Sequence, residues 1–192
     1  MLKYALIAVI FSSSSFANYY DFDSEGYLLR PENYREWIFA GTATTPKSVY
    51  KEVLFPDFQN VYIDPKSYQY WKTEGEFPDG TILVKELLTK GPTQSAVGNG
   101  FYQGDYYSLS VALKSKEMFP NTDGNWNYFS FVDKKAKRLK SKSKALGERC
   151  SSCHQNNAPD GAVFYNYFSV LRDAKGFGEG APENLDTRIG LK

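Results

Sequence analysis

Short runs of apolar and aromatic residues, each closed by a turn signal, recur along most of this 192-residue chain. The clearest run is Trp126–Val132, in which the side chains alternate in character as in a strand with one buried face. Further runs lie at residues 37–42, 60–63, 81–88, 101–103 and 105–113. The 15 Tyr, 14 Phe and 3 Trp residues favour strands. We therefore predict a mainly β fold, an antiparallel sheet or sandwich.

Helical signals are few. A short helix is predicted over Pro31–Glu36, with proline near its first position, and another over Pro65–Thr73. Only Ala162–Ala174 has helical spacing, and this predicts a C-terminal helix with the apolar stripe Val163, Phe164, Tyr167, Val170 and Leu171. We find no repeat and no boundary, so residues 18–192 are predicted to form a single domain, with 176–192 as an exposed tail.

The first 17 residues read as a secretory signal peptide. Lys3 precedes the apolar run Tyr4–Phe11, and Ser15-Phe16-Ala17 predicts cleavage after Ala17. The run is too short to span a bilayer, which takes about 20 residues. No cysteine lies near the cut, so a lipid anchor is excluded. We expect a protein exported to the periplasm, with no membrane anchor.

Charge and cysteine content exclude several classes of protein. The net charge is +1, which gives no reason to expect nucleic acid as a partner. Two cysteines close at most one bridge, so a disulfide scaffold is excluded. With one histidine besides, the chain has too few residues for a zinc site of four Cys and His ligands.

The sequence Cys150-Ser151-Ser152-Cys153-His154 is a C-x-x-C-H motif, the attachment signature of haem c. Each thiol adds to a vinyl group of the porphyrin, and the histidine that follows binds the iron. The motif holds both cysteines and the only histidine of the chain. We predict one covalent haem c, attached through Cys150 and Cys153, with His154 as the iron ligand.

Three other chemistries fit the same residues. A thioredoxin-like redox pair requires a βαβ context, which the strand pattern lacks. A Cys150–Cys153 disulfide leaves His154 without a role. Zinc bound by the two thiolates, His154 and Asp160 lacks the second ligand pair that structural zinc sites use.

The number of histidines and methionines limits which residues could bind the second face of the iron. If His154 binds on one side, no histidine remains for the other, and Met118 is the only methionine outside the predicted signal peptide. In methionine-ligated carriers the methionine usually follows the haem motif, whereas Met118 precedes it. We therefore predict an open iron face, which suits ligand binding or chemistry rather than simple electron transfer.

Many further segments resemble the cytochrome P460 family, which includes the β-sheet cytochromes c′. These are Tyr34–Trp37 with Gly41-Thr42, Val61–Pro65 with Ser67-Tyr68, Gly75–Leu87, Gly98–Gly100, Gly124–Trp126, Tyr128–Phe131, and the haem motif followed by Val163-Phe164 and Val170–Arg172. The resemblance implies an antiparallel β fold, a homodimer and a five-coordinate haem c. Within the family, cytochromes P460 oxidise hydroxylamine, while cytochromes c′-β bind nitric oxide and carbon monoxide.

The resemblance extends to a lysine that the P460 enzymes bond to a meso carbon of the porphyrin, which corresponds to Lys85. On a strand, Lys85 shares a face with Leu83 and Leu87. That position suits a lysine facing a cofactor. The alternative is an edge-strand lysine that prevents aggregation, and alternation cannot decide because the other face is equally apolar.

Two further correspondences depart from the family pattern. The distal acid of the enzymes falls at Asp160 or Gly161, where Asp160 is either the proton acceptor or a turn residue. A pocket arginine before the V-Y-I-D segment corresponds to Gln59, which removes a cation. Both departures argue against efficient turnover.

A basic stretch precedes the haem motif, formed by Lys134, Lys135, Lys137, Arg138, Lys140, Lys142 and Lys144. It is interpreted either as a docking face for an acidic partner cytochrome or as a solvated hairpin. The leading functional hypothesis is a haem-dependent oxidoreductase acting on hydroxylamine or a related nitrogen species, with Lys85 and Asp160 as catalytic candidates. A non-catalytic binder of nitric oxide or carbon monoxide is the alternative, and an electron carrier using Met118 is the third.

Overall fold

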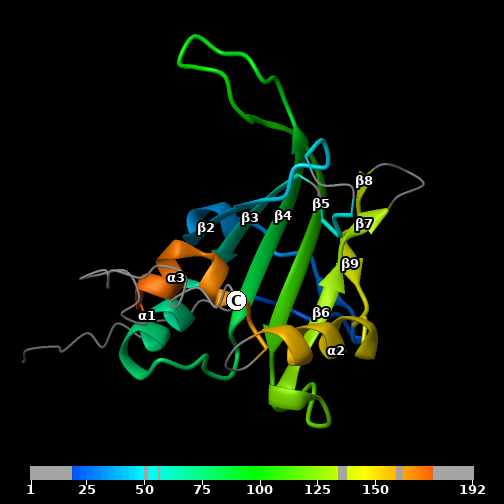
Figure 1. The fold of residues 1–192 in the computed structure, drawn as a ribbon. Helices are drawn as coiled ribbons and strands as arrows, with labels where there is room; N and C mark the ends of the chain where they lie inside the picture. Colours follow the sequence, from blue (N-terminus) through cyan, green and yellow to red (C-terminus); the bar gives the residue numbers. More distant parts are fainter. Residues whose placement is uncertain (1–18, 50–51, 56, 134–137, 159–161, 175–192) are drawn as a thin grey trace, which may run out of the picture.

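The computed structural model describes residues 19–49, 52–55, 57–133, 138–158 and 162–174. A five-stranded antiparallel sheet forms its centre (Figure 1). In spatial order its strands are β2 (Ile38–Thr44), β3 (Phe58–Ile63), β4 (Ile82–Lys90), β5 (Gln103–Lys114) and β6 (Trp126–Ser130). Spatial order equals chain order, so each strand pairs with the next one along the chain. The predicted mainly β, antiparallel fold is confirmed.

β4 is the central strand, and its register determines what each face of the sheet presents. Lys85 lies opposite Val61 of β3 and Ser110 of β5. Because side chains alternate along a strand, Leu83, Lys85 and Leu87 lie on one face, here termed the front face. The even-numbered residues of β4 lie on the back face. A lysine on the central strand of five is not an edge-strand lysine, so that interpretation of Lys85 is wrong.

The helix predicted over 65–73 is α1 (Pro65–Glu74). Asp64 caps it by accepting a hydrogen bond from Ser67 N–H at 2.8 Å, proline occupies its first turn, and Gly75 ends it in the left-handed region at φ 71°. The second carboxylate oxygen of Asp64 accepts from Ile82 N–H at 3.1 Å. One side chain therefore starts α1 and ties it to β4.

Two small sheets accompany the central one. They pair β1 (Leu28–Leu29) with β9 (Lys142–Ser143), and β7 (Val132–Asp133) with β8 (Arg138–Leu139). The strand predicted over 126–132 is thus divided at Phe131, where the chain leaves the central sheet. Phe131 still donates its N–H to Leu109 O at 2.9 Å, but its carbonyl accepts from Lys140 N–H at 2.7 Å.

The remaining helices differ from the sequence predictions. The helix predicted over 31–36 is only the 3-10 turn η1 (Tyr34–Glu36), and a second such turn, η2 (Asp123–Asn125), precedes β6. The helix predicted over 162–174 is interrupted: η3 (Tyr165–Tyr167) and α3 (Ser169–Ala174) are separated by Phe168, which is extended at φ −118° and ψ 112°. The break lets Tyr165 and Phe168 both enter the core.

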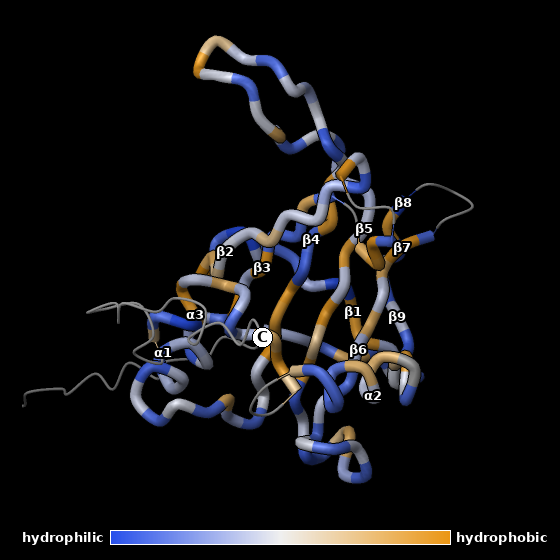
Figure 2. Tube along the Cα trace, viewed as in Figure 1, coloured by the Kyte–Doolittle hydropathy of each residue, from blue (hydrophilic) through white to orange (hydrophobic). Residues whose placement is uncertain are grey.

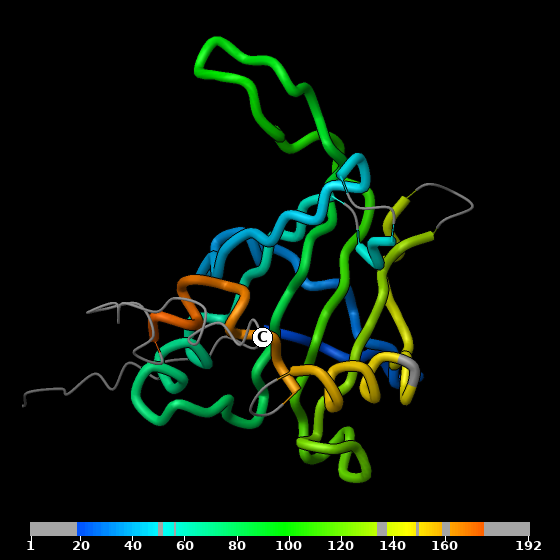
Figure 3. Tube along the Cα trace, viewed as in Figure 1, coloured from blue at the N-terminus to red at the C-terminus, as the bar shows by residue number. Residues whose placement is uncertain are grey.

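α2 (Glu148–Asn157) carries the C-x-x-C-H motif and was not predicted. Its sequence is mostly polar, and the apolar stripe that reveals an amphipathic helix is missing. In Figure 3, α2 and α3 lie in front of the sheet, while the described N-terminal residues, drawn in blue, cross behind it.

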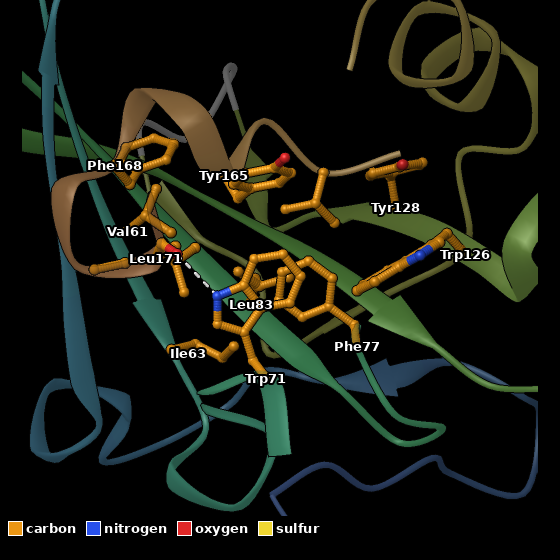
Figure 4. Close-up of a cluster of buried hydrophobic side chains, with 12 residues drawn as sticks. Val61, Ile63, Trp71, Phe77, Leu83, Trp126, Tyr128, Tyr165, Phe168 and Leu171 are labelled. Atoms are coloured by element: carbon orange, nitrogen blue, oxygen red, sulfur yellow. Dashed lines mark hydrogen bonds between the residues drawn. The ribbon is translucent and has the colours of Figure 1, made fainter. Parts of the chain in front are cut away.

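Each face of the sheet has its own core. Figure 2 shows hydrophobic residues along the middle of β4, consistent with burial on both faces. Figure 4 shows the front core, which joins the sheet to α1, η3 and α3 through Ala40, Val61, Ile63, Trp71, Phe77, Leu83, Trp126, Tyr128, Val163, Tyr165, Phe168 and Leu171. The back core consists of Leu28, Ile82, Val84, Leu109, Val111, Leu113, Phe119, Phe129 and Phe131.

Three predictions fall entirely on residues that the structure does not describe. The signal peptide (1–17) and the tail (176–192) are two of them, and the third concerns Asp160 and Gly161. Within the described residues, no helix is long and apolar enough to cross a membrane.

Candidate haem site

The haem motif lies on α2, which packs against β6 on the front of the sheet. Leu146, two residues before α2, donates its N–H to the carbonyl of Tyr128 in β6 at 2.8 Å. This bond holds the start of α2 against the sheet. Within α2, Cys150 lies three residues before Cys153 and four before His154, so the three side chains share one side of the helix. Cys150 is half-buried against the front core and Cys153 is exposed, and the two do not form a disulfide with each other.

The imidazole of His154 is held on three sides. Its ring centroid lies 4.2 Å from that of Tyr128 and 5.0 Å from that of Phe164. Its Nδ1 lies 2.9 Å from the carbonyl oxygen of Ala162. A carbonyl can only accept, so Nδ1 carries the proton and donates it, and Nε2 keeps the lone pair that binds a metal.

Burial is the main influence on the protonation of His154. It lowers the pKa of the imidazole, the bond to Ala162 O acts in the opposite direction, and the charge of Lys85 lowers the pKa further. These effects together favour the neutral imidazole, which is the form that binds iron.

Lys85 faces this site from the centre of β4. Its Nζ lies 3.8 Å from the centroid of the Phe55 ring, a cation–π contact. Burial lowers the pKa of Lys85 to about 8, and only the partial charge of Cys150 acts in the other direction. Lys85 is therefore a front-face lysine with electrostatic coupling to both Cys150 and His154.

Gln59 lies on the same face and supports the loop that carries Phe55. Its Nε2 donates to the carbonyl of Phe55 at 3.2 Å and to Oγ1 of Thr45 at 3.2 Å. The hydroxyl of Thr45 also donates to the Phe55 carbonyl, at 2.5 Å. Gln59 therefore contributes hydrogen bonds, and no cation, at the position where the resemblance predicts an arginine in the family.

Met118 does not approach this site. It lies in the turn after β5, its side chain is 42% exposed, and the next residue, Phe119, belongs to the back core. The motif occupies the opposite face of the sheet. Met118 therefore lies in an exposed turn next to a residue of the back core, and no contact joins it to the motif among the described residues.

The basic stretch before the motif is partly neutralised. Lys142 Nζ pairs with Asp23 at 2.6 Å and with Glu25 at 3.1 Å. Lys142 and Lys144 both lie over the ring of Tyr27, at 4.5 and 4.7 Å from its centroid. Lys134, Lys135 and Lys137 lie outside the described residues.

Sequence reasoning missed Tyr128, Ala162, Phe164 and Phe55 as parts of the site. Only Tyr128 had a usable signal, because it alternates with Trp126 along the clearest strand. Ala162 and Phe164 follow His154 by only 8 and 10 residues, but no local pattern predicts that the chain turns back onto the histidine there. Phe55 lies 30 residues before the lysine that it contacts.

The site residues fit haem c. Two thiols and a histidine share one side of a helix, and the histidine presents Nε2 with its other nitrogen already hydrogen-bonded, an arrangement typical of haem and metal ligands. Among the described residues, no three His, Cys, Asp or Glu side chains form a group that could hold a metal ion by themselves. Asp160, which the zinc interpretation requires, is outside the described part of the chain, so that interpretation is untested.

Fold and site together define a mainly β protein with one C-x-x-C-H site for haem c. The Cytochrome P460 family model matches residues 31–165, which include the sheet and the motif. The chain belongs to the cytochrome P460 family, and it is therefore a haem protein of the c type within that family. No curated protein matched the chain.

Proposed function

We propose that this protein binds hydroxylamine or a related small nitrogen species at the open face of a haem c iron, oxidises it and passes the electrons to a partner cytochrome. The observation that carries the proposal is the state of His154, whose Nδ1 is held by Ala162 O, so that Nε2 carries the lone pair. His154 is the only histidine, and Met118 lies in an exposed turn beside Phe119 of the back core. Family membership supports the oxidoreductase class.

In this proposal Cys150 and Cys153 hold the porphyrin, and His154 binds the iron. When bound, the haem supplies the site that accepts electrons from the nitrogen ligand. Phe55 packs on the amine of Lys85 and Phe164 packs on the ring of His154, so both groups have an aromatic neighbour. Asp160 is the proposed proton acceptor.

Lys85 is proposed to bond to a meso carbon of the porphyrin through its Nζ. Forming that bond replaces one N–H and one C–H bond and releases two electrons and two protons. Hydrogen peroxide is the proposed acceptor, and it leaves as two molecules of water. A pKa of about 8 makes the neutral, nucleophilic amine accessible at mildly alkaline pH.

Binding of nitric oxide or carbon monoxide without turnover is the second candidate. The apolar ring of Phe55 beside Lys85 favours it, because small uncharged gases can bind in apolar surroundings and need no proton acceptor. The neutral Gln59 in place of a cation favours it as well.

The test is a visible spectrum of the protein matured in a host that attaches haem c, oxidised and reduced, with and without hydroxylamine. We expect a haem-stained band on a denaturing gel, a high-spin spectrum and reduction by hydroxylamine. Colourless protein or a six-coordinate low-spin iron contradicts the proposal. Haem that binds nitric oxide but is not reduced by hydroxylamine selects the second candidate.

The lysine bond has its own test. Proteolysis of the matured protein is expected to give a haem peptide that contains Lys85, and the ferrous spectrum is expected to be strongly red-shifted. Lys85→Ala should abolish both features, whereas Lys72→Ala, on the exposed side of α1, should retain them. A wild-type haem peptide without Lys85 removes the bond from the proposal.

Export, docking and assembly are proposed on the sequence. A secreted form that begins at Asn18 supports cleavage after Ala17. A fall in the reduction rate of an acidic partner cytochrome with rising ionic strength supports docking at the basic stretch (134–144). A mass of two chains in solution supports the homodimer.

A further inference from the structure

One backbone carbonyl near the motif accepts two side-chain hydrogen bonds. Ala162 O lies 2.9 Å from Nδ1 of His154 and 3.2 Å from the hydroxyl of Tyr128. Both side chains are donors in these bonds, because the acceptor is a carbonyl. Tyr128 and His154 are therefore coupled through a single oxygen, in addition to their ring contact at 4.2 Å.

The three groups are held firmly by separate parts of the fold. Tyr128 is 6% exposed and paired with Ala112 in the central sheet. His154 lies on α2. Ala162 has φ 64°, a left-handed conformation that is unusual for alanine and that sets the direction of its carbonyl.

Sharing of the carbonyl has an electronic consequence. A second donor withdraws electron density from the oxygen, so each bond to that oxygen is weaker than it would be alone. A weaker bond to Nδ1–H leaves the imidazole with less anionic character. Hydrogen bonding behind an axial histidine is one of the means by which a protein adjusts the iron.

We propose that Tyr128 is a positioning residue for the axial histidine: its hydroxyl shares the Ala162 carbonyl with His154, limits electron donation from His154 to the iron, and raises the reduction potential of the haem. The inference rests on the proposed binding of haem iron by His154. A histidine that donates less strongly stabilises ferric iron less, so the ferrous state is favoured. A high potential in turn suits an iron that must accept electrons from a ligand.

Tyr128→Phe tests the inference because it removes only the hydroxyl and keeps the ring. In the ferrous, haem-loaded protein we expect the iron–histidine stretching frequency to rise. We expect the equilibrium between oxidised and reduced haem to shift at least threefold toward oxidised, which lowers the potential by about 28 mV for one electron. Tyr167→Phe is the matched control, since Tyr167 stacks on Phe164 at 5.6 Å and is 52% exposed.

A fluorinated tyrosine at position 128 provides a second test that does not depend on the stability of the Phe variant. Fluorine makes the phenol a stronger donor at nearly the same size, so the frequency and the potential should move in the opposite direction. A purely structural role of Tyr128 predicts no such reversal. Unchanged frequency and potential in both proteins overturn the inference, whereas failure of the wild type to attach haem overturns the proposed function instead.

Discussion

Replacing Lys85 by methionine is expected to stabilise the haem-free protein at neutral pH. Lysine on the front face must keep a charge among Leu83, Leu87 and the ring of Phe55, away from most of its water. Methionine has a similar length and a flexible apolar side chain that fills the same space without a charge. The variant thus removes a cost that the wild type carries in the folded state.

The magnitude follows from the pKa of Lys85. Burial lowers this pKa from 10.5 to about 8, and each unit corresponds to about 1.4 kcal/mol, so a charged Lys85 costs the folded state about 3 kcal/mol at pH 7. The cation–π contact with Phe55 returns about 0.5–1 kcal/mol. We expect Lys85→Met to raise the free energy of unfolding by about 2 kcal/mol at pH 7.

The pH dependence has a definite sign. Between pH 8 and 10.5 the unfolded chain keeps the proton on Lys85 while the folded chain loses it, so the stability of the wild type rises with pH across this window. Above pH 10.5 the lysine is neutral in both states. The advantage of the methionine variant should therefore be full at pH 7 and largely gone at pH 10.5.

The assay is urea unfolding followed by tryptophan fluorescence, on protein made without haem attachment, at pH 7 and at pH 10.5. Lys72→Met is the control, because Lys72 is exposed on α1 and its replacement should change stability little at either pH. A difference between wild type and Lys85→Met that is the same at both pH values, or a variant that is less stable at pH 7, would refute the reasoning.

Three further predictions concern the scaffold and the open iron. Asp64→Ala removes the cap of α1 and the bond to Ile82 N–H, and should cost about 2–3 kcal/mol in urea unfolding; a loss below about 0.5 kcal/mol contradicts the dual role. Trp71→Phe leaves Leu171 O without its 2.9 Å donor, and should lower the thermal midpoint by a few degrees, about 1 kcal/mol; an unchanged midpoint argues against this tie. Met118→Ala should leave the ferric and ferrous spectra unchanged, and a loss of low-spin character would restore the methionine-ligated carrier.

Prediction from the sequence succeeded where the signal is local. The run around β4 and the helix α1 follow from residues adjacent in the chain, because strand alternation, the Asp64-Pro65 start and the Gly75 end are all local features. The helix expected over 162–174 failed for the converse reason. Its apolar spacing reflects burial against the sheet, and Phe168 reaches the core in an extended conformation.

The failure to predict α2 has a related cause. Patterns detect helices by the apolar face that they bury against protein, whereas the sequence of α2 is mostly polar and has no such stripe. The residues of α2 that pack against the rest of the protein are Cys150 and His154. Their spacing matches a haem-attachment motif and gives no separate signal for a helix. A helix that presents its side chains to a cofactor lacks the apolar stripe of an amphipathic helix, because those side chains do not pack against protein.

The sequence by itself determined the strands, the antiparallel class and the C-x-x-C-H motif, because each depends on residues within a few positions of one another. Only the tertiary structure decided that Lys85 lies on the central strand and faces the motif, since both faces of β4 are equally apolar. The tertiary structure alone also showed that the hydroxyl of Tyr128 donates to the carbonyl of Ala162, which lies 34 residues further along the chain. Contacts of that kind arise from the packing of distant segments, and no local pattern carries them.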